Sequence, residues 1–474
     1  MAYENKGAMA ATIVVAASDS LNKAAANYVC DGVADNVEIQ AAIDALPAGG
    51  GKVVLLEGTF NLASTLTGIV GLALVGCGKN TILFLSDGAE CHMVNLVNLS
   101  DVSICDIVFD GNRAGQTVAA HIVRIENTPD VYLEYLEVKN AAQHGIIAVA
   151  VGSNGRIIVQ SCYTHDNGDA INVGSGVYLA NADNSVVSDL ISHDNTADGC
   201  QFINSDNLVI SATCVDNDRY GIMLDASHNA IIKGICKGSS VGCYMGASNY
   251  ANMDIVSQDN KLDGIRFQDC IYCNCNFNSL NNGQGGIGAG LNLRGATNHC
   301  NIRGIALDNQ GIATQDYGVL EGNTSDYNNI RNVVVVGYST LPMYIVGLHT
   351  IVDKSYISVK LDLSGAAADI EVYFADTPGC LVGYTIVYTE ASSADAGVNV
   401  RLGRYQDGVA LDDDYFDLVV SEVSKALGYH KTYVSGDLTQ KVIAAGDTVT
   451  VGTAGGKTGT GEVMIILHIA EMAS

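Results

Sequence analysis

The fold is decided between residues 199 and 224, which read GCQFINSDNLVISATCVDNDRYGIML. A glycine opens this stretch, and Gly221 opens its next copy. Copies of about 20 to 25 residues are typical of a solenoid. Two or three strands of about four to five residues and their turns fill one copy without room for a helix, so the sequence predicts an all-β parallel β-helix. The glycines that open the copies are Gly176, Gly199, Gly221, Gly242, Gly264, Gly290 and Gly318.

The residues that follow each of these glycines alternate between two faces. Successive side chains of a strand point to opposite sides, so the first and third residues after the glycine are expected to face the core. These inward pairs are Val177/Leu179, Cys200/Phe202, Ile222/Leu224, Cys243/Met245, Ile265/Phe267 and Leu291/Leu293. The residues between them are expected to face water, and they are Tyr178, Gln201, Met223, Tyr244, Arg266 and Asn292.

An asparagine recurs in phase with the glycines and begins a second short strand in each copy. A side-chain amide can donate to the amide one coil above, and asparagine tolerates the left-handed backbone of a tight turn. Like residues are therefore expected to stack at about 4.8 Å, over about ten to eleven coils. The column consists of Asn184, Asn207, Asn229, Asn252, Asn274, Asn301 and Asn329, at steps of 23, 22, 23, 22, 27 and 28 residues.

Both ends of the repeat carry other elements. Residues 31–47 predict a helix over the open first coil, in which Asp35 and Glu38 have the spacing of a capping box. One face of this helix is apolar and consists of Ile39, Ile43 and Leu46. We therefore assign residues 1–60 to an N-terminal cap and entry strand, 61–337 to the β-helix and 338–365 to a connecting region. Alternating strands between Gly and Asp turns in residues 366–474 predict an antiparallel β-sandwich.

Charge and apolar runs exclude several classes of partner. The formal net charge is -27, and the 24 basic residues do not cluster, which argues against nucleic acid and against an anionic membrane surface. No run reaches the roughly 18 apolar residues of a membrane span, so no membrane insertion is expected. The N-terminus lacks the basic and apolar pattern of a signal peptide.

The 14 cysteines are interpreted as buried small hydrophobic residues in a reducing compartment. Cys200 and Cys243 fall in the inward column, and Cys214 and Cys236 occupy equivalent positions of successive copies. The alternative is half of a metal site, because three cysteines lie close together in a later copy. They are Cys270, Cys273 and Cys275.

The stretch from Asp31 to Phe60, which ends GKVVLLEGTF, resembles the N-terminal entry of the pectate-lyase-like superfamily. Together with the coils, the similarity covers about residues 10–337 and implies a right-handed parallel β-helix. That superfamily includes polysaccharide lyases, glycoside hydrolases and bacteriophage tailspikes. The terminal strands resemble the small β-sandwich modules that end many phage tail proteins, which implies a domain that helps three chains assemble.

Outward-facing positions supply the candidate active site. Asp169 and Asp198 stand at the corners of coils with one insertion between them, and a separation of about 5 to 10 Å would suit glycoside hydrolysis. Asp225 is the third catalytic candidate. A shallow groove of carboxylates, Arg and Tyr suits an extended sugar chain, which offers hydroxyl groups and apolar ring faces. The candidate substrate-binding residues are Arg124, Glu126, Tyr178, Gln201, Tyr244, Arg266 and Arg294.

No metal-ligand set and no cofactor are predicted. His165 and His193 repeat in the same Asp-Asn turn and are interpreted as turn residues, with a metal site on the two rings as the alternative. The resemblance implies that Ca²⁺ is a possible cofactor, because the superfamily includes calcium-dependent lyases. Those lyases need several Asp or Glu ligands around the cation and an Arg base, and this set is incomplete in this chain. The Gly-His and Arg-x-Lys elements of the superfamily's galacturonases are absent from the sequence.

The resemblance implies two alternative functions. The first is a tailspike-type depolymerase, a glycosidase or lyase that binds and cleaves a bacterial cell-surface polysaccharide as the phage receptor. The second is a non-catalytic virion fibre that binds glycan or is purely structural. Both imply a homotrimer in the virion tail, in contact with other tail proteins and assembled in the host cytoplasm.

Overall fold

The computed structural model describes residues 11–152, 155–286, 288–310, 314–322, 324–345 and 349–353, and beyond them the backbone of nine strands between residues 356 and 471. The chain divides into two units, residues 1–255 and 256–474. None of the described helices is long and apolar enough to cross a bilayer. The short 3-10 helices of the described part are Lys23–Ala25, Gly78–Asn80 and Arg113–Gly115.

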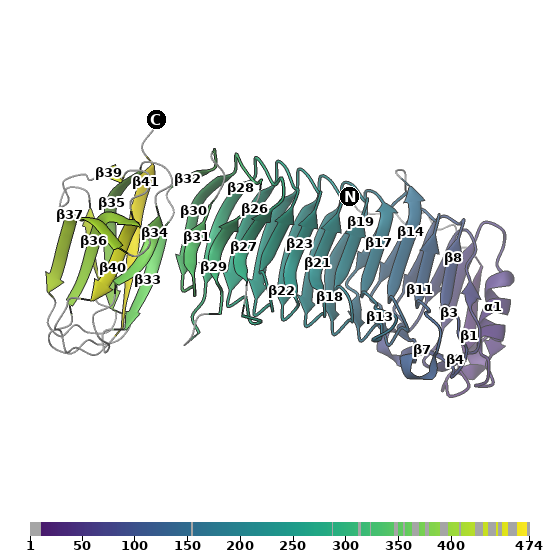
Figure 1. The fold of residues 1–474 in the computed structure, drawn as a ribbon. Coiled ribbons are helices and arrows are strands. Elements are labelled where there is room, and N and C mark those ends of the chain that lie inside the picture. The colour runs from purple at the N-terminus through teal and green to yellow at the C-terminus, as the bar shows by residue number, and fades with distance from the viewer. Residues whose placement is uncertain are drawn as a thin grey trace. The chain divides into compact units, whose positions relative to one another are not determined.

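One sheet of the first unit takes a single parallel strand from each coil (Figure 1). Its register places Val177 beside Cys200, Cys200 beside Ile222 and Ile222 beside Cys243, so the residues after the repeated glycines lie in one column. The strands, in spatial order, are β5 (Leu66–Thr67), β8 (Val94–Val97), β11 (Val123–Glu126), β14 (Ile146–Gly152), β17 (Val177–Ala182), β19 (Cys200–Ile203), β21 (Tyr220–Asp225) and β23 (Val241–Gly246).

The other faces of the first unit are parallel strands as well. One row contains β1 (Thr12–Ala16), β3 (Gly51–Leu55), β6 (Leu72–Val75), β9 (Val102–Cys105), β12 (Val131–Glu134), β15 (Ile157–Gln160), β18 (Val186–His193), β20 (Val209–Val215) and β22 (Ile231–Lys237). A shorter row contains β4 (Gly58–Leu62), β7 (Thr81–Leu85), β10 (Val108–Asp110), β13 (Glu137–Lys139) and β16 (Tyr163–His165), and it joins the first row at β18. The short β2 (Tyr28–Val29) pairs with β1, and β24 (Asn252–Gln258) crosses the boundary of the units.

The second unit continues the same coil pattern with parallel strands. One row contains β25 (Ile265–Gln268), β27 (Ala289–Arg294), β29 (Tyr317–Glu321) and β31 (Leu341–Tyr344). The other row contains β26 (Asn274–Leu280), β28 (Asn301–Leu307), β30 (Asn329–Val336) and β32 (Ile351–Asp353).

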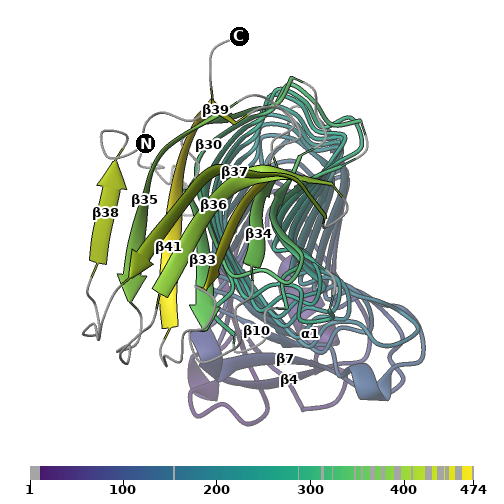
Figure 2. The ribbon, with the colours of Figure 1, turned by 60° about the vertical axis from the view of Figure 1, so that its left-hand side comes forward.

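The last strands of the chain pair in antiparallel fashion, as the sequence predicts for residues 366–474. In Figure 2, β38 (His430–Val434), β35 (Gly379–Tyr388) and β41 (Glu462–Glu471) lie side by side. This group also contains β33 (Tyr356–Asp362) and β39 (Val442–Ile443), and a second group contains β34 (Asp369–Phe374), β36 (Gly397–Gln406), β37 (Val409–Ser421) and β40 (Thr448–Thr453). The packing of the two groups as a sandwich, and the domain boundaries at 60, 337 and 365, stay predictions.

The predicted core columns are confirmed, and the predicted outward column needs a correction. All twelve inward side chains of the six pairs are fully buried. Of the residues between them, Gln201, Met223 and Asn292 are also buried instead of facing water. Polar neighbours cover Gln201 and Asn292 on the outer face of the sheet, because Gln201 contacts Arg219 and Asn292 contacts Asp263.

The repeated glycines are required by the close approach of successive coils. A Cβ on Gly199 would lie 2.6 Å from the carbonyl oxygen of Gly221 and 2.7 Å from Cys214 Sγ. A Cβ on Gly221 would lie 2.6 Å from the carbonyl oxygen of Gly242. Real atoms do not approach so closely, so only glycine fits at these positions in an undistorted stack.

The predicted asparagine column is two columns in the structure, which is a correction. Asn184, Asn207 and Asn229 occupy left-handed corners, and Asn207 donates to Asn184 Oδ1 at 3.2 Å. In the next coil the corner belongs to Tyr250, and Asn252 begins the strand two residues later. The second unit keeps this later arrangement. Its corners are Tyr272, His299 and Tyr327, whose rings stack on one another, while an amide ladder joins Asn274, Asn301 and Asn329.

Helix α1 (Asn36–Asp44) lies over the first strands, as predicted (Figure 1). Its predicted apolar face is buried at Ile39, Ile43 and Leu46. The predicted capping box is wrong, because the Asp35 side chain makes no bond to the helix. Its two oxygens instead accept the backbone N–H groups of Gly32 at 2.8 Å and Asn61 at 2.7 Å, which ties the start of the helix to β4.

These elements confirm the right-handed parallel β-helix with an N-terminal helical cap. The sheet that contains β5 has eight strands in the first unit and four, β25 to β31, in the second, so the described part of the chain forms twelve coils instead of about ten to eleven. The sequence underestimates the number because the early coils have longer turns and strands as short as the two residues of β5.

Candidate functional site

The candidate site lies on the outer face of the sheet β14–β17–β19–β21 and is named here the Arg219 cluster. The register places Tyr178, Gln201 and Met223 beside one another on this face. The residue that directly precedes each repeated glycine forms a second column along the same edge. The Arg219 cluster consists of His144, Tyr178, Asp198, Gln201 and Arg219.

Asp198 holds Arg219 at the surface. The carboxylate is fully buried, and its two oxygens accept Nε of Arg219 at 2.8 Å and the Arg219 Nη2 group. The backbone N–H of Tyr220 donates to the same carboxylate at 3.2 Å. Burial raises the pKa of Asp198 while the guanidinium opposes this, and the carboxylate in turn raises the pKa of Arg219. Because an Arg side chain stays protonated and both Asp198 oxygens accept hydrogen bonds from it, the pair is ionised at neutral pH.

The remaining contacts of Arg219 fix the direction in which it faces. Its Nη2 donates to Gln201 Oε1 at 3.3 Å, and Gln201 Oε1 also accepts the hydroxyl of Ser175. The guanidinium carbon lies 5.2 Å from the ring centre of Tyr220, which stacks on Tyr244 at 4.9 Å. Arg219 nevertheless keeps 46% of its side chain exposed, so a cation is presented to solvent in a fixed orientation.

A stack of three histidines leads to the cluster. The rings of His92 and His121 lie 4.9 Å apart, and those of His121 and His144 lie 5.2 Å apart. Nδ1 of each ring accepts a backbone N–H from the next coil, at 3.0 to 3.3 Å. An imidazole that accepts at Nδ1 carries its proton on Nε2. Burial lowers the pKa of His121 to about 3 and that of His144 to about 4, so both rings are neutral donors at pH 7.

Tyr178 completes the cluster. Its ring centre lies 4.9 Å from that of His144. Burial raises the pKa of Tyr178, and the charge of Arg219 opposes this shift. At neutral pH the cluster therefore presents one guanidinium, one Nε2–H and one phenolic hydroxyl on the same surface. Such a set of donors suits an oxyanion or a carboxylate.

The predicted catalytic carboxylates have different surroundings in the structure. Asp169 accepts the backbone N–H groups of Ile171 at 2.7 Å and Asn172 at 2.6 Å, and these bonds lower its pKa, so it is an ionised turn residue. Asp225 ends β21, and no hydrogen bond joins it to Asp169 or Asp198 in the described part of the chain. With Asp198 held by Arg219, the geometry does not support a pair of hydrolytic carboxylates.

The predicted substrate-binding residues fall into three groups. Tyr178 and Gln201 belong to the Arg219 cluster, and Tyr244 reaches it through Tyr220. Arg124 and Glu126 form an ion pair on β11, where Arg124 also donates to Asn95 Oδ1 at 2.9 Å. In the second unit, Arg266 and Arg294 both face the buried carboxylate of Asp263.

Sequence reasoning missed His144, Ser175, Arg219 and Tyr220. A usable signal exists for three of them, because each directly precedes a glycine of the repeat, at Gly145, Gly176 and Gly221. Arg219 has no such signal, since its role depends on a contact with Asp198 of the preceding coil.

Several clusters of potential metal ligands are explained by structural contacts. His165 and His193 stack at 4.9 Å, but the Nδ1 atom of each faces its neighbouring Asp instead of a shared point. Cys270, Cys273 and Cys275 are buried. This agrees with their interpretation as core residues.

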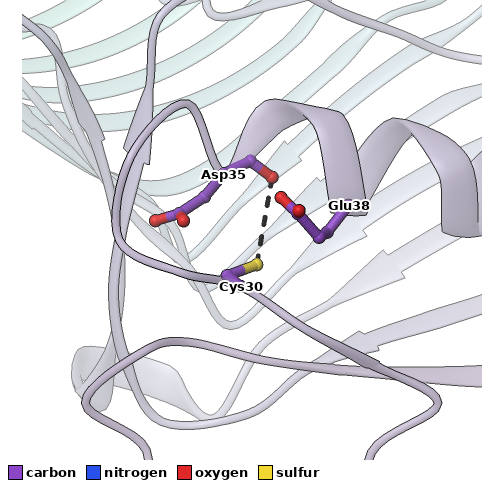
Figure 3. A group of neighbouring side chains, drawn as sticks. All are labelled: Cys30, Asp35 and Glu38. Atoms are coloured by element: carbon purple, nitrogen blue, oxygen red, sulfur yellow. Dashed lines mark hydrogen bonds between the residues drawn. The ribbon is translucent and has the colours of Figure 1, made fainter.

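One group of three potential ligands lies under the N-terminal cap (Figure 3). It consists of Cys30, Asp35 and Glu38. Burial and the charges of Asp35 and Glu38 raise the pKa of Cys30 to about 12, so its sulfur stays protonated and donates to the carbonyl of Asp35. Metal binding requires the thiolate. Because both oxygens of Asp35 already accept backbone N–H groups, the contacts of this group fit the cap and not a metal ion.

Comparison with known proteins gives a likeness of fold. No protein-family model matches the sequence, and no curated protein sequence matches it. The A-module of the Azotobacter vinelandii mannuronan C-5 epimerase AlgE6 superposes with a TM-score of 0.61 and 19% identity, over 68% of this chain and 95% of that module. The A-module of AlgE4 from the same organism gives a TM-score of 0.60 and 21% identity, over 68% and 96%. The chain thus shares the β-helix fold of these modules.

Proposed function

We propose that this protein acts on an acidic polysaccharide of the uronate class, at the Arg219 cluster. The single observation that supports this most is the position of Arg219, which the buried Asp198 orients beside the donors His144 and Tyr178. Guanidinium groups match the planar carboxylate of a uronate in charge and geometry. The likeness to two mannuronan C-5 epimerase modules supports a carbohydrate substrate and suggests mannuronan as the first polymer to test.

The reaction that we propose begins with removal of the C5 proton of the uronate. Pairing of the carboxylate with Arg219 makes this proton more acidic, and the Nε2–H of His144 stabilises the negative charge that develops on the carboxylate oxygens. Tyr178, as phenolate, accepts the proton. The resulting carbanion has two outcomes. In the first outcome the C4–O bond breaks, the departing sugar oxygen takes the proton from Tyr178, and a C4=C5 double bond remains, which cleaves the chain. In the second outcome a water molecule protonates C5 from the opposite face, and the hydroxide that it leaves takes the proton from Tyr178, which inverts C5.

The second candidate is glycan binding without reaction. It is favoured by the protonated state of Tyr178 at neutral pH and by the engagement of the Asp198 carboxylate with Arg219. In this case the cluster would bind the same acidic sugar through the same contacts.

Incubation of the protein with polymannuronate in D₂O separates these possibilities. Loss of the H5 signal in the NMR spectrum reports proton removal, and a new ultraviolet absorbance of unsaturated uronate reports cleavage. The expected result is H5 exchange that is abolished in Arg219→Gln. Binding of the polymer without exchange would leave the second candidate, and absence of both would reject the proposal.

The biological setting that we propose is a bacteriophage tail. Its support is the resemblance of the entry segment 31–60 to a superfamily that includes bacteriophage tailspikes, and the resemblance of the terminal strands to the modules that end many phage tail proteins. The second resemblance also implies a homotrimer. Light scattering of the purified chain tests the trimer, and electron microscopy of virions with antibody against the chain tests its place in the tail.

A further inference from the structure

The second unit contains another polar cluster on the outer face of a sheet, named here the Asp263 cluster. It consists of Asp263, Arg266, Asn292 and Arg294. The Asp263 side chain is 2% exposed. Its Oδ1 accepts the backbone N–H of Ala289 at 2.9 Å, and its Oδ2 accepts Arg266 Nε at 2.6 Å and Asn292 Nδ2 at 3.0 Å.

The Asp263 cluster carries more positive than negative charge. Nη2 of Arg294 lies 3.9 Å from Asp263 Oδ2, so two guanidinium groups share one carboxylate. Arg294 keeps 41% of its side chain exposed, and Arg266 keeps 16%. In a chain with a formal net charge of -27, an excess of positive charge around one carboxylate on a sheet surface is a specific feature. It favours an anionic ligand.

Asn292 provides an independent sign of a ligand. Its side chain is fully buried, and its Oδ1 atom has no hydrogen-bond partner. The bond from Nδ2 to Asp263 fixes which atom of the amide is the oxygen. A buried acceptor without a donor is unfavourable, and native structures rarely keep one unless something else supplies the donor. A donor from a ligand would satisfy this oxygen.

The Arg219 cluster shows how a buried amide oxygen in this column is satisfied when donors are present. Both clusters place an Asp directly before a repeated glycine and contain a buried amide two residues after a repeated glycine. Gln201 lies in the same coil as Asp198, whereas Asn292 lies one coil after Asp263, beside Arg266. Gln201 Oε1 accepts hydrogen bonds from Arg219 and Ser175. Asn292 Oδ1, in the same column of the second unit but one coil after Asp263, has no donor. The Asp263 cluster therefore combines the same groups, a buried Asp, an Arg and a buried amide, but leaves one hydrogen-bond acceptor open.

We propose that the Asp263 cluster is a second subsite for an acidic sugar. The carboxylate of a uronate residue pairs with Arg266 and Arg294, and a hydroxyl of the same sugar donates to Asn292 Oδ1. Exposed Arg294 is the group that moves aside to admit the sugar. Sulfate has no proton to donate at neutral pH, so the open acceptor selects a hydroxy acid. This assignment rests on the proposed function for the class of polymer, but it concerns binding alone.

Calorimetric titration of the whole protein tests the subsite with three probes. They are the hexamer of β-1,4-linked mannuronate, the hexamer of β-1,4-linked mannose, which has CH₂OH in place of each carboxylate, and sodium sulfate. Wild type is expected to bind the mannuronate hexamer at least about tenfold more tightly than the mannose hexamer, since charged hydrogen bonds are the stronger ones. Arg294→Gln should weaken the mannuronate hexamer about tenfold and leave the mannose hexamer unchanged. Asn292→Ala should also weaken the mannuronate hexamer about tenfold, and it should weaken the mannose hexamer as well, because both hexamers offer the hydroxyl that donates to Asn292 Oδ1.

A matched control and a second readout keep the outcomes distinct. Arg303→Gln removes the same charge from the exposed face of β28 and should bind like wild type. Wild-type affinity in both Arg294→Gln and Asn292→Ala would overturn the subsite, whether or not the protein shows H5 exchange. Equal competition by sulfate would overturn the assignment to a uronate. Conversely, weakened binding in these variants without H5 exchange in wild type would reject the proposed reaction and leave the subsite standing.

Discussion

The fully buried carboxylate of Asp198 accepts Arg219 Nε at 2.8 Å and a second bond from Arg219 Nη2, across the interval between two coils. The β-helix makes this contact available because it stacks the coil that ends in Arg219, two residues before Gly221, directly on the coil in which Asp198 precedes Gly199. The position of the cation at the candidate site is therefore a consequence of coil register. A change in either residue should affect both stability and binding.

Replacement of Asp198 by Asn should destabilise the protein and impair the site. The variant loses a charged hydrogen bond to Arg219, and we expect a decrease of about 1 to 3 kcal/mol in the free energy of unfolding, discounted because Arg219 is partly exposed. Urea unfolding measures this change. Binding of acidic oligosaccharide should weaken at least about tenfold, because the guanidinium is no longer held in place. Asp225→Asn is the control, since Asp225 lies at the end of β21 outside this ion pair.

The histidine stack should make stability depend on pH between about 3 and 6.5. The folded pKa is about 4 for His144 and about 3 for His121, below the ordinary value of about 6.5, so the unfolded chain binds protons first as the pH falls. Stability due to these rings is complete above pH 6.5 and is lost on acidification towards the folded pKa values. At pH 5 the loss is about 2 kcal/mol for each ring.

Urea unfolding of wild type and His144→Gln at pH 7 and pH 5 measures this effect. The variant should lose less stability than wild type over the interval, by about 2 kcal/mol, because it lacks one titrating ring. The comparison cancels the contribution of the carboxylates, which titrate in both proteins. An identical loss in both would contradict the neutral, buried state of His144.

The β-helix itself is predictable from the sequence because its cause is local and periodic. Glycine at a fixed interval allows the close approach of coils that Gly199 and Gly221 make, and the alternating residues after it define the core. The asparagine column shows where periodicity fails. Asn229 occupies the left-handed corner of its coil, whereas in the next coil Tyr250 occupies the corner and Asn252 begins the strand. The sequence interval between the two asparagines is nevertheless almost the same as between two corner asparagines, so the change cannot be seen from the spacing.

The candidate site is only partly predictable, since it depends on contacts between coils. Tyr178 and Gln201 follow from their outward positions, and Asp198 from its place at a corner. The role of Asp198 does not follow, because a carboxylate paired with Arg219 and one free for catalysis have the same sequence position. His144 was missed because the preceding coils are irregular in length, which hides the repeated glycine that it precedes, Gly145.

Replacement of Gly199 by Ala should destabilise the first unit. The new Cβ would lie 2.6 Å from the carbonyl oxygen of Gly221, so two coils must separate locally. We expect the free energy of unfolding to fall by at least about 2 kcal/mol. Gly49→Ala is a matched control because its Cβ would meet nothing within 4 Å, and it should stay within about 0.5 kcal/mol of wild type. Equal stability of the two variants in urea would contradict the close packing of the coils.

Replacement of Tyr178 by Phe separates reaction from binding. The ring keeps its contact with His144, so binding of the mannuronate hexamer should stay within about threefold of wild type. The rate of H5 exchange should fall about 100-fold or more, since the proton acceptor is gone. Burial raises the pKa of Tyr178, so the wild-type rate should increase with pH through the neutral range as the phenolate fraction grows. A wild-type rate that is flat between pH 6 and 9, or exchange that survives in the Phe variant, would assign proton removal to another group.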